Sequence, residues 1–367
     1  MRLEPVAYMT WAKTNLERGD IHNLGSSGIR ELLDLDDLGV STSGLTIAGR
    51  NEDGLPALRA AIAARYRVPG DQVLVAEGAS LANFLVLAAW LRPGDPVLLE
   101  EPYYEPLGSV LRALGARVRY VAVDGPQGHR AILSALRGGR IGRWRAAVVT
   151  NPHNPTGQVI GEDLLAELAS ACEEQGALLV VDEAYREILF EEPPGCAVHC
   201  GPCVASTASL TKVYGLSHLR VGWGIGPASL IARAIRIHDN LGVVHPFLTE
   251  AIGASVMADS SRLALWRERI RTRVEANRKA LAGVLSVSSY LEGGLPPQGI
   301  LAFLHWKGTD RFPDAEVLCD QARKRARIVL VPGRFFQRPE WLRIAVGGLE
   351  PKVAAACAAL AAFLGEG

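Results

Sequence analysis

The middle of the chain alternates short apolar runs with helical patterns, and this alternation limits the possible folds more than any other feature. Apolar runs without polar alternation are typical of strands that are buried on both faces of a sheet. Helical patterns between such strands indicate parallel pairing through crossover helices. The sequence therefore predicts an α/β fold with a mostly parallel central sheet covered by helices.

The predicted elements of this region follow one another closely. Strands are expected at 72–78, 96–102, 116–123, 145–152 and 177–185, and helices at 79–91, 106–115 and 161–176. Sheets of this kind bind ligands beyond the carboxyl ends of their strands. The residues to inspect are therefore those just after each strand, at 78–80, 101–104, 151–157 and 182–185.

The last third of the chain has a different pattern. A long amphipathic helix is predicted over 263–285, followed by short strands at 299–306, 326–333 and 341–347 and a closing helix, which indicates a smaller α+β domain. At about 150 residues per domain, 367 residues suggest two domains. We predict an N-terminal segment that docks on the small domain, a large domain and a small C-terminal domain, at 1–44, 45–245 and 246–367.

Composition excludes several classes of protein. Lys plus Arg and Asp plus Glu both number 39, so the basic excess of a nucleic-acid binder is missing. The most apolar helical runs, 81–91 and 354–364, are shorter than the roughly 20 residues that span a bilayer. The first residues do not resemble a signal peptide, and six cysteines form no disulfide framework. We expect a cytosolic protein without membrane or nucleic-acid partners.

Two segments after predicted strands suit an anion and a reactive amine. Gly78, Ala79 and Ser80 lie between a strand and a helix, where free backbone N–H groups and the helix dipole favour a phosphate. Further along, 206–224 contains a lysine, Lys212, between Ser209 and Arg220. A serine that only caps a helix and a lysine on a solvated face are the ordinary alternatives for each residue taken alone.

Two further strand ends carry amides and carboxylates. The sequence NPHNPTG at 151–157 forms turns and offers asparagine side chains that can donate to a ring oxygen. The sequence DEAY at 182–185 ends the most apolar strand. A carboxylate at that place must be paired, and a protonated heterocyclic nitrogen is one suitable partner of Asp182.

Together these motifs resemble the class I and II aminotransferases, which have fold type I and depend on pyridoxal 5′-phosphate (PLP). The resemblance covers roughly 45–350 and rests on six motifs in the family's order, which are GAS, EPYY, NPHNPTG, DEAY, SLTK with Arg220, and WLRIAV. It implies that Lys212 forms an aldimine with PLP and later moves a proton at the substrate Cα. It also implies that Asp182 keeps the pyridine nitrogen protonated, so that the ring withdraws electrons.

The resemblance implies a role for each remaining motif residue. Tyr185 and Asn154 would contact the phenolic oxygen of the ring, and Tyr104 would stack on its face. Arg343 would bind the substrate α-carboxylate, with Asn154 and Gly25 beside it. The phosphate would be held by Gly78, Ala79, Ser80, Ser209 and Arg220. The catalytic residues would be Lys212, Asp182 and Tyr185.

Two features depart from the family or compete with it. The tyrosine that usually contacts the partner subunit's phosphate is missing, because position 49 is Gly, with Arg50 as a possible substitute. The segment 196–203 holds Cys196, Cys200, Cys203 and His199, which is a conceivable zinc site. It lacks paired C-x-x-C elements, so we expect no metal and interpret it as a surface loop.

We expect a homodimeric PLP-dependent aminotransferase that moves an amino group between an L-amino acid and a 2-oxo acid. One alternative is PLP-dependent elimination and cyclisation of a hydroxylated amino acid, because 20–29 and 236–250 are loosely similar to capreomycidine synthase. A regulatory aminotransferase-like module is the alternative from another class, but the chain has no room for its N-terminal winged helix. The identities of the donor and the acceptor stay open.

Overall fold

The computed structural model describes residues 3–16, 21–30, 36–41, 46–125, 127–138, 143–188 and 195–365. Seven strands form the central sheet, in the order β2-β8-β7-β6-β5-β3-β4. Neighbouring strands are parallel except at β8, which is antiparallel to both β2 and β7. The predicted α/β fold with a mostly parallel sheet is therefore confirmed. The strands are β2 (Val73–Ala76), β3 (Pro96–Glu101), β4 (Arg117–Ala122), β5 (Ala146–Thr150), β6 (Leu178–Asp182), β7 (Val204–Ser209) and β8 (Gly222–Ile225).

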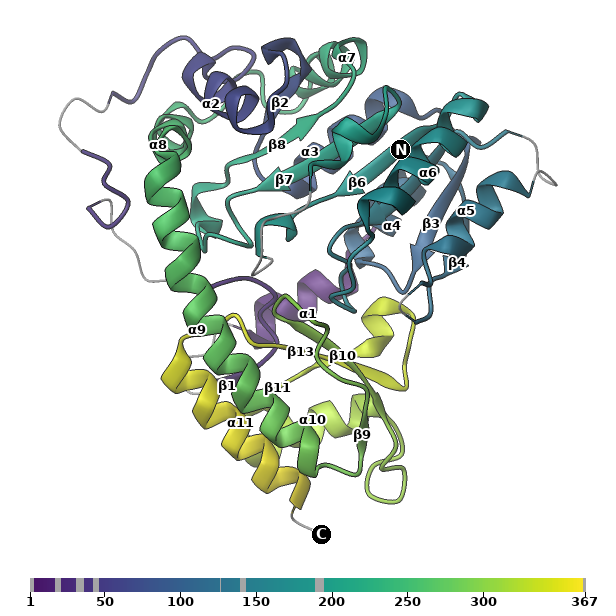
Figure 1. Cartoon of the computed structure of the whole chain (residues 1–367), viewed down its shortest axis with the longest axis vertical. Coiled ribbons are helices and arrows are strands. Elements are labelled where there is room, and N and C mark those ends of the chain that lie inside the picture. Colours follow the sequence, from purple (N-terminus) through teal and green to yellow (C-terminus); the bar gives the residue numbers. More distant parts are fainter. Residues whose placement is uncertain are drawn as a thin grey trace.

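Helices cover both faces of this sheet, as its apolar strands require (Figure 1). One face packs against α3 (Ala79–Trp90), α4 (Glu105–Ala113) and α7 (Ala228–His238). The other packs against α5 (Arg130–Arg137) and α6 (Glu162–Gln175), and toward β2 and β8 against α2 (Pro56–Tyr66) and α8 (Phe247–Ala258). Short 3₁₀ turns lie at η1 (Gly70–Gln72), η2 (Arg186–Ile188), η3 (Ala197–Cys200) and η4 (Ser217–Leu219).

The small domain is built on an antiparallel sheet of order β12-β13-β10-β9. Its strands are β9 (Leu291–Glu292), β10 (Leu301–Trp306), β12 (Val331–Pro332) and β13 (Trp341–Ala345). Its helices are α9 (Ser260–Val287), α10 (Ala315–Ala326) and α11 (Glu350–Gly365), with the 3₁₀ turn η5 (Gly333–Phe336). Within the ranges described, no helix is long and apolar enough to cross a membrane.

Helix α9 connects the two domains, running from beside α8 down to the small sheet (Figure 1). Helix α8 packs mainly against α2 of the large domain. These contacts favour a domain boundary inside α9. The boundary expected at residue 246 from the sequence stays a prediction.

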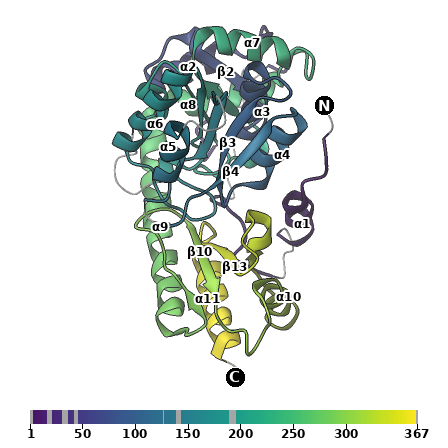
Figure 2. The ribbon, with the colours of Figure 1, turned by 90° about the vertical axis from the view of Figure 1, so that its right-hand side faces the viewer.

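The N-terminal segment contacts both domains. Strand β1 (His22–Asn23) pairs in parallel with β11 (Ile328–Val329) of the C-terminal region. The single strand expected over 326–333 is thus divided between two sheets, β11 and β12. Helix α1 (Ala7–Asn15) lies at the junction of the domains (Figure 2), against the aromatic residues of η5. The segment therefore reaches further than the small domain alone.

Candidate active site

One end of the site is a cradle of backbone at the start of α3. Gly78 adopts a φ of +93° and precedes the helix without a side-chain cap, so the first N–H groups of α3, at Ala79 and Ser80, point out of the helix end. A Cβ atom at Gly78 would lie 2.4 Å from Nη2 of Arg220. That nitrogen donates to the carbonyl of Glu77 at 2.7 Å, so the guanidinium covers the loop.

The strand ends facing this cradle come from β7 and β8. Ser209 ends β7, and its Oγ accepts a hydrogen bond from the amide of Thr211 at 3.3 Å. Arg220 is exposed and has a φ of +54°, just before β8 begins. Backbone amides, a hydroxyl and an exposed cation at a helix N-terminus are the groups that hold a phosphate.

The centre of the site is formed by Lys212 and Asp182. Nζ of Lys212 donates to Oγ of Ser27 at 2.9 Å and lies 5.9 Å from the ring centroid of Tyr185. Burial raises the pKa of Asp182, whereas hydrogen bonds and the charge of Lys212 act in the opposite direction. Such a buried carboxylate is suited to a cationic partner.

Two hydrogen bonds orient Asp182, and Asn83, which donates one of them, belongs to no motif of the sequence. Oδ1 of Asp182 accepts from the amide of Ala184 at 3.0 Å, and its Oδ2 accepts from Nδ2 of Asn83 at 2.8 Å. Oδ1 of Asn83 accepts in turn from Oγ1 of Thr207 at 2.7 Å. The signal for Asn83 was present in the sequence, because it is the one amide in the apolar run 81–91.

The other end of the site is built around Arg343 of β13, which is fully buried. Its Nη1 donates to Oδ1 of Asn154 at 2.9 Å, and its Nη2 donates to Oη of Tyr8 at 2.9 Å and to the carbonyl of Gly25 at 3.0 Å. Its Nε is buried and has no hydrogen-bond partner among the residues that the structure describes. The structure thus brings together Arg343, Asn154 and Gly25, and their role in binding substrate stays a prediction.

Aromatic residues connect the centre to this end. The hydroxyl of Tyr185 donates to the carbonyl of Ser27 at 2.7 Å. Tyr104 packs edge-to-face on Tyr8 with 6.0 Å between ring centroids. Tyr8 and Ser27 are site residues that no motif indicated, because both belong to the N-terminal segment, far in sequence from the strand ends.

The cysteine loop at 196–203 is the segment in which a zinc site was considered and not expected. In the structure, Sγ of Cys196 donates to the buried carboxylate of Glu183 at 3.0 Å. Sγ of Cys203 donates to the carbonyl of Ala169 at 3.2 Å. Cys172, Cys319 and Cys357 are buried in helices.

Two His–Glu groups lie elsewhere in the described part of the chain. In the first, around Glu77, the rings of His238 and His245 stack at 3.9 Å with 6° between planes. A histidine nitrogen binds a metal ion in the plane of its own ring. Because the two rings are stacked in nearly parallel planes, a single ion cannot lie in both planes.

The second group surrounds Glu100 beneath the NPHNPTG loop. Oε1 of Glu100 accepts from the amide of Thr150 at 2.7 Å, and Oε2 lies 2.9 Å from Nε2 of His129. Nε2 of His153 lies 2.9 Å from the carbonyl of Pro102. Burial raises the pKa of Glu100 to about 7 and lowers that of His129 to about 4. The group is a satisfied hydrogen-bond network that supports the loop carrying Asn154.

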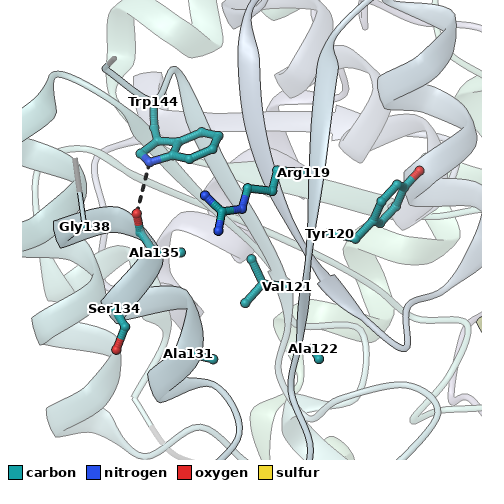
Figure 3. Close-up of a pocket in the computed structure, with 9 residues that line it drawn as sticks. All are labelled: Arg119, Tyr120, Val121, Ala122, Ala131, Ser134, Ala135, Gly138 and Trp144. Carbon is teal, nitrogen blue, oxygen red and sulfur yellow. Dashed lines mark hydrogen bonds between the residues drawn. The ribbon is translucent and has the colours of Figure 1, made fainter. Parts of the chain in front are cut away.

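A surface hollow between β4 and α5 lies apart from these residues (Figure 3). Arg119, Val121 and Trp144 line it, and Nε1 of Trp144 donates to the carbonyl of Ala135 at 3.2 Å. The lining contains neither a carboxylate nor any predicted site residue. The described lining of the hollow therefore offers none of the groups that gather at the strand ends.

Comparisons with known proteins agree with this geometry. The sequence model described as Aminotransferase class I and II matches residues 42–360, and the chain belongs to this family. It is 30% identical over 357 residues to the capreomycidine synthase of Streptomyces vinaceus, covering 96% of this chain and 90% of that protein. It is 29% identical over 293 residues to the arginine–pyruvate transaminase AruH of Pseudomonas aeruginosa, covering 77% and 73%.

A solved structure shows the same architecture over the whole chain. The PLP-dependent cyclase OrfR superposes with a TM-score of 0.87 at 27% identity, covering 99% of this chain and 98% of that one. PLP is the cofactor of this chain, as predicted. The residues present suit it, since a Cβ atom would fill the cradle at Gly78 and the buried Asp182 is suited to a cationic ring nitrogen.

Proposed function

We propose that the chain is a PLP-dependent aminotransferase that moves an amino group between an L-amino acid and a 2-oxo acid. The observation that carries the proposal is the fully buried Arg343, whose guanidinium is joined through Tyr8 and Ser27 to Lys212. A buried fork of N–H donors recognises a planar carboxylate. The amine and the fork together suit a substrate with an amino group and a carboxylate on one carbon.

The residues at the centre and at the substrate end of the site would have distinct roles in this reaction. The bound cofactor supplies a ring that accepts the electron pair released at the substrate Cα. Asp182, fixed by Asn83 and Ala184, would hold a proton on the ring nitrogen. Lys212 would hold the cofactor through its aldehyde and would move a proton at the substrate Cα. Arg343 and Asn154 orient the substrate through its carboxylate.

The remaining residues of the site would bind the phenolic oxygen and the phosphate of the cofactor. Oδ1 of Asn154 is engaged by Arg343, which leaves its Nδ2 to donate to the phenolic ring oxygen. Tyr185 is positioned by its bond to Ser27 and can exchange that acceptor for the same ring oxygen. Arg220, Ser209 and the amides of Ala79 and Ser80 would hold the phosphate.

A second candidate is elimination and cyclisation of a hydroxylated amino acid. It is supported by the capreomycidine synthase and the cyclase OrfR, whose similarity extends over nearly the whole chain. Both candidates use the same Lys212, Asp182 and Arg343, so the site residues alone do not separate them. The products formed from a given amino acid do.

We also propose a homodimer. Large apolar side chains are exposed on two neighbouring segments, which are joined by a hydrogen bond of 2.8 Å from Nδ2 of Asn51 to the carbonyl of His245. The exposed residues are Ile47, Leu241, Val243, Val244 and Leu248. Val243 has a φ of +62°, a costly conformation for a β-branched residue. A second copy covering this surface would account for both features, and the mass in solution tests it. The cytosolic location stays a prediction.

The replacement Lys212→Ala tests the proposed chemistry. Loss of the amine should remove the visible absorbance of covalently bound cofactor and lower turnover by about 10⁴-fold or more. Lys307→Ala is the control, because Lys307 is half-exposed and pairs with Glu292 on the small domain. Normal absorbance and turnover in Lys212→Ala would contradict the assignment.

Single-turnover reactions separate the two candidates. Purified holoenzyme is mixed with one amino acid at a time, including arginine and hydroxyarginine, without any oxo acid. One equivalent of 2-oxo acid would support transamination and identify the donor. A non-oxo product with regenerated absorbance would support elimination or cyclisation.

A further inference from the structure

Helix α1 lies beside the junction between the domains (Figure 2), and its Tyr8 is buried. The amides of Ala7 and Tyr8 donate to the carboxylate of Glu105, at 3.1 and 2.6 Å, which ties the start of α1 to the start of α4. The ring of Tyr8 also packs on Phe335 and Phe336 of the small domain, at 5.7 and 6.0 Å between centroids. The side chain is thus held from both domains.

The hydroxyl of Tyr8 occupies a functional position. It accepts the hydrogen bond from Nη2 of Arg343, so it takes one of the acceptor positions that a substrate carboxylate would use. The other acceptors of this guanidinium, Asn154 and the carbonyl of Gly25, are neutral. Of the three acceptor oxygens, only the phenol oxygen of Tyr8 can also donate a hydrogen bond or become an anion.

We propose that Tyr8 is a positioning residue for substrate binding, whose neutral hydroxyl holds Arg343 in place and donates to the substrate carboxylate, and whose phenolate competes with that carboxylate. The inference rests on the proposed function, because it takes Arg343 as the carboxylate-binding residue. Its consequence is that the affinity for carboxylates falls when Tyr8 loses its proton.

The charges around Tyr8 bring this ionisation toward the working range. Burial raises the pKa of Tyr8, but Arg343, Lys212 and hydrogen bonds from Arg343 and Ser27 outweigh it, so the net pKa is lowered from its usual value. The other titratable neighbours are Tyr104, which packs on the ring, and Glu105, which accepts from the backbone. Arg343 donates directly to the hydroxyl, so its charge stabilises the phenolate also when Lys212 holds the cofactor.

The test measures binding of propionate, which has a carboxylate and no amine. Calorimetric titrations of holoenzyme at pH 7 and pH 9.5 compare the wild type with Tyr8→Phe. The wild type should bind propionate several-fold more weakly at the higher pH. Tyr8→Phe should bind it roughly 3–10-fold more weakly at pH 7 and show a smaller change with pH, while its cofactor absorbance stays that of the wild type.

Two further variants make the outcome specific. Trp11→Phe alters the same helix and should keep the wild-type pH dependence. The ring of Trp11 packs against that of Phe335, tilted at 5.5 Å, and against that of Tyr8, stacked at 6.4 Å, and the variant keeps an aromatic ring there. Arg343→Lys should lose most binding. If Arg343→Lys loses propionate but Tyr8→Phe matches the wild type at both pH values, the role of Tyr8 is wrong. If Arg343→Lys also binds normally, the proposed function itself fails.

Discussion

The two ends of the active site are built in opposite ways. At the cradle, Arg220 is exposed and the groups available to an anion are backbone amides beside Gly78. At the other end, Arg343 is completely buried and already holds Tyr8, Asn154 and the carbonyl of Gly25. One end is open and made of local backbone, whereas the other is closed and made of side chains from distant segments.

This difference separates the tasks of the two ends. Backbone amides at a helix start bind a cofactor phosphate without further side-chain ordering. A buried guanidinium with fixed acceptors, by contrast, admits only a ligand that replaces or joins those acceptors. The cradle is therefore suited to retaining the cofactor, and the closed end to selecting the substrate.

Among changes at the two ends of the site, replacing Arg343 with lysine should have the largest effect and should act on one end only. Two charge-assisted hydrogen bonds at about 1.5–2 kcal/mol each correspond to a loss of about 100-fold or more in kcat/KM. Cofactor absorbance should not change. Steady-state kinetics measure the effect, with Arg334→Lys as control, since Arg334 pairs with Glu316 near the surface. Equal losses in both variants would contradict a special role for Arg343.

The network around Glu100 tests the support of the closed end. The folded state raises the pKa of Glu100 from 4.5 to about 7, so folding favours the protonated form. Glu100 therefore contributes to the free energy of unfolding at low pH. This contribution, up to about 3 kcal/mol, is lost as pH rises through about 7. Glu100→Gln should lack this decline.

Urea unfolding of the wild type and Glu100→Gln at pH 5 and pH 8 measures the difference. The neighbouring His129 is present in both proteins, so its own titration enters both curves. Parallel changes in unfolding free energy for the two proteins would show that Glu100 is ionised at both pH values.

Gly78→Ala should have the smallest effect and should act at the cradle. The added Cβ meets Arg220 and forces a positive φ on alanine, which costs about 1–2 kcal/mol and should weaken PLP binding about tenfold. Equilibrium dialysis of PLP measures it. Gly94→Ala is the matched control, because Gly94 has a φ of +89° and nothing within 4 Å of the added atom. Equal PLP affinities in the two variants would show that Gly78 is not part of the phosphate-binding cradle.

The cradle and the centre of the site could be predicted from the sequence because each is local. Gly78 adjoins a strand and a helix, and Lys212 lies within eleven residues of both Ser209 and Arg220. Strands β2, β3, β5 and β6 were predictable for a related reason, since each contains a continuous apolar run. Local signals of this kind need no knowledge of tertiary contacts. Strand β7 (VASTAS) is buried but carries hydroxyls, and it is not among the strands predicted from apolar runs.

The closed end could be predicted only through the family resemblance, and then incompletely. Tyr8 and Arg343 are 335 residues apart, and nothing around Tyr8 distinguishes it from a core tyrosine. The same applies to Ser27, whose contact with Lys212 spans 185 residues. The division of 326–333 between two sheets also depended on a distant partner, β1.

The pairing of β1 with β11 affects how the chain folds as it is made. His22 finds its partner only when residue 328 has left the ribosome, by which time every strand of the central sheet is already available. The large domain can therefore assemble first, while the N-terminal segment waits for the C-terminal one. Completion of the substrate end, which needs both Tyr8 and Arg343, must therefore wait until residue 343 has been synthesised.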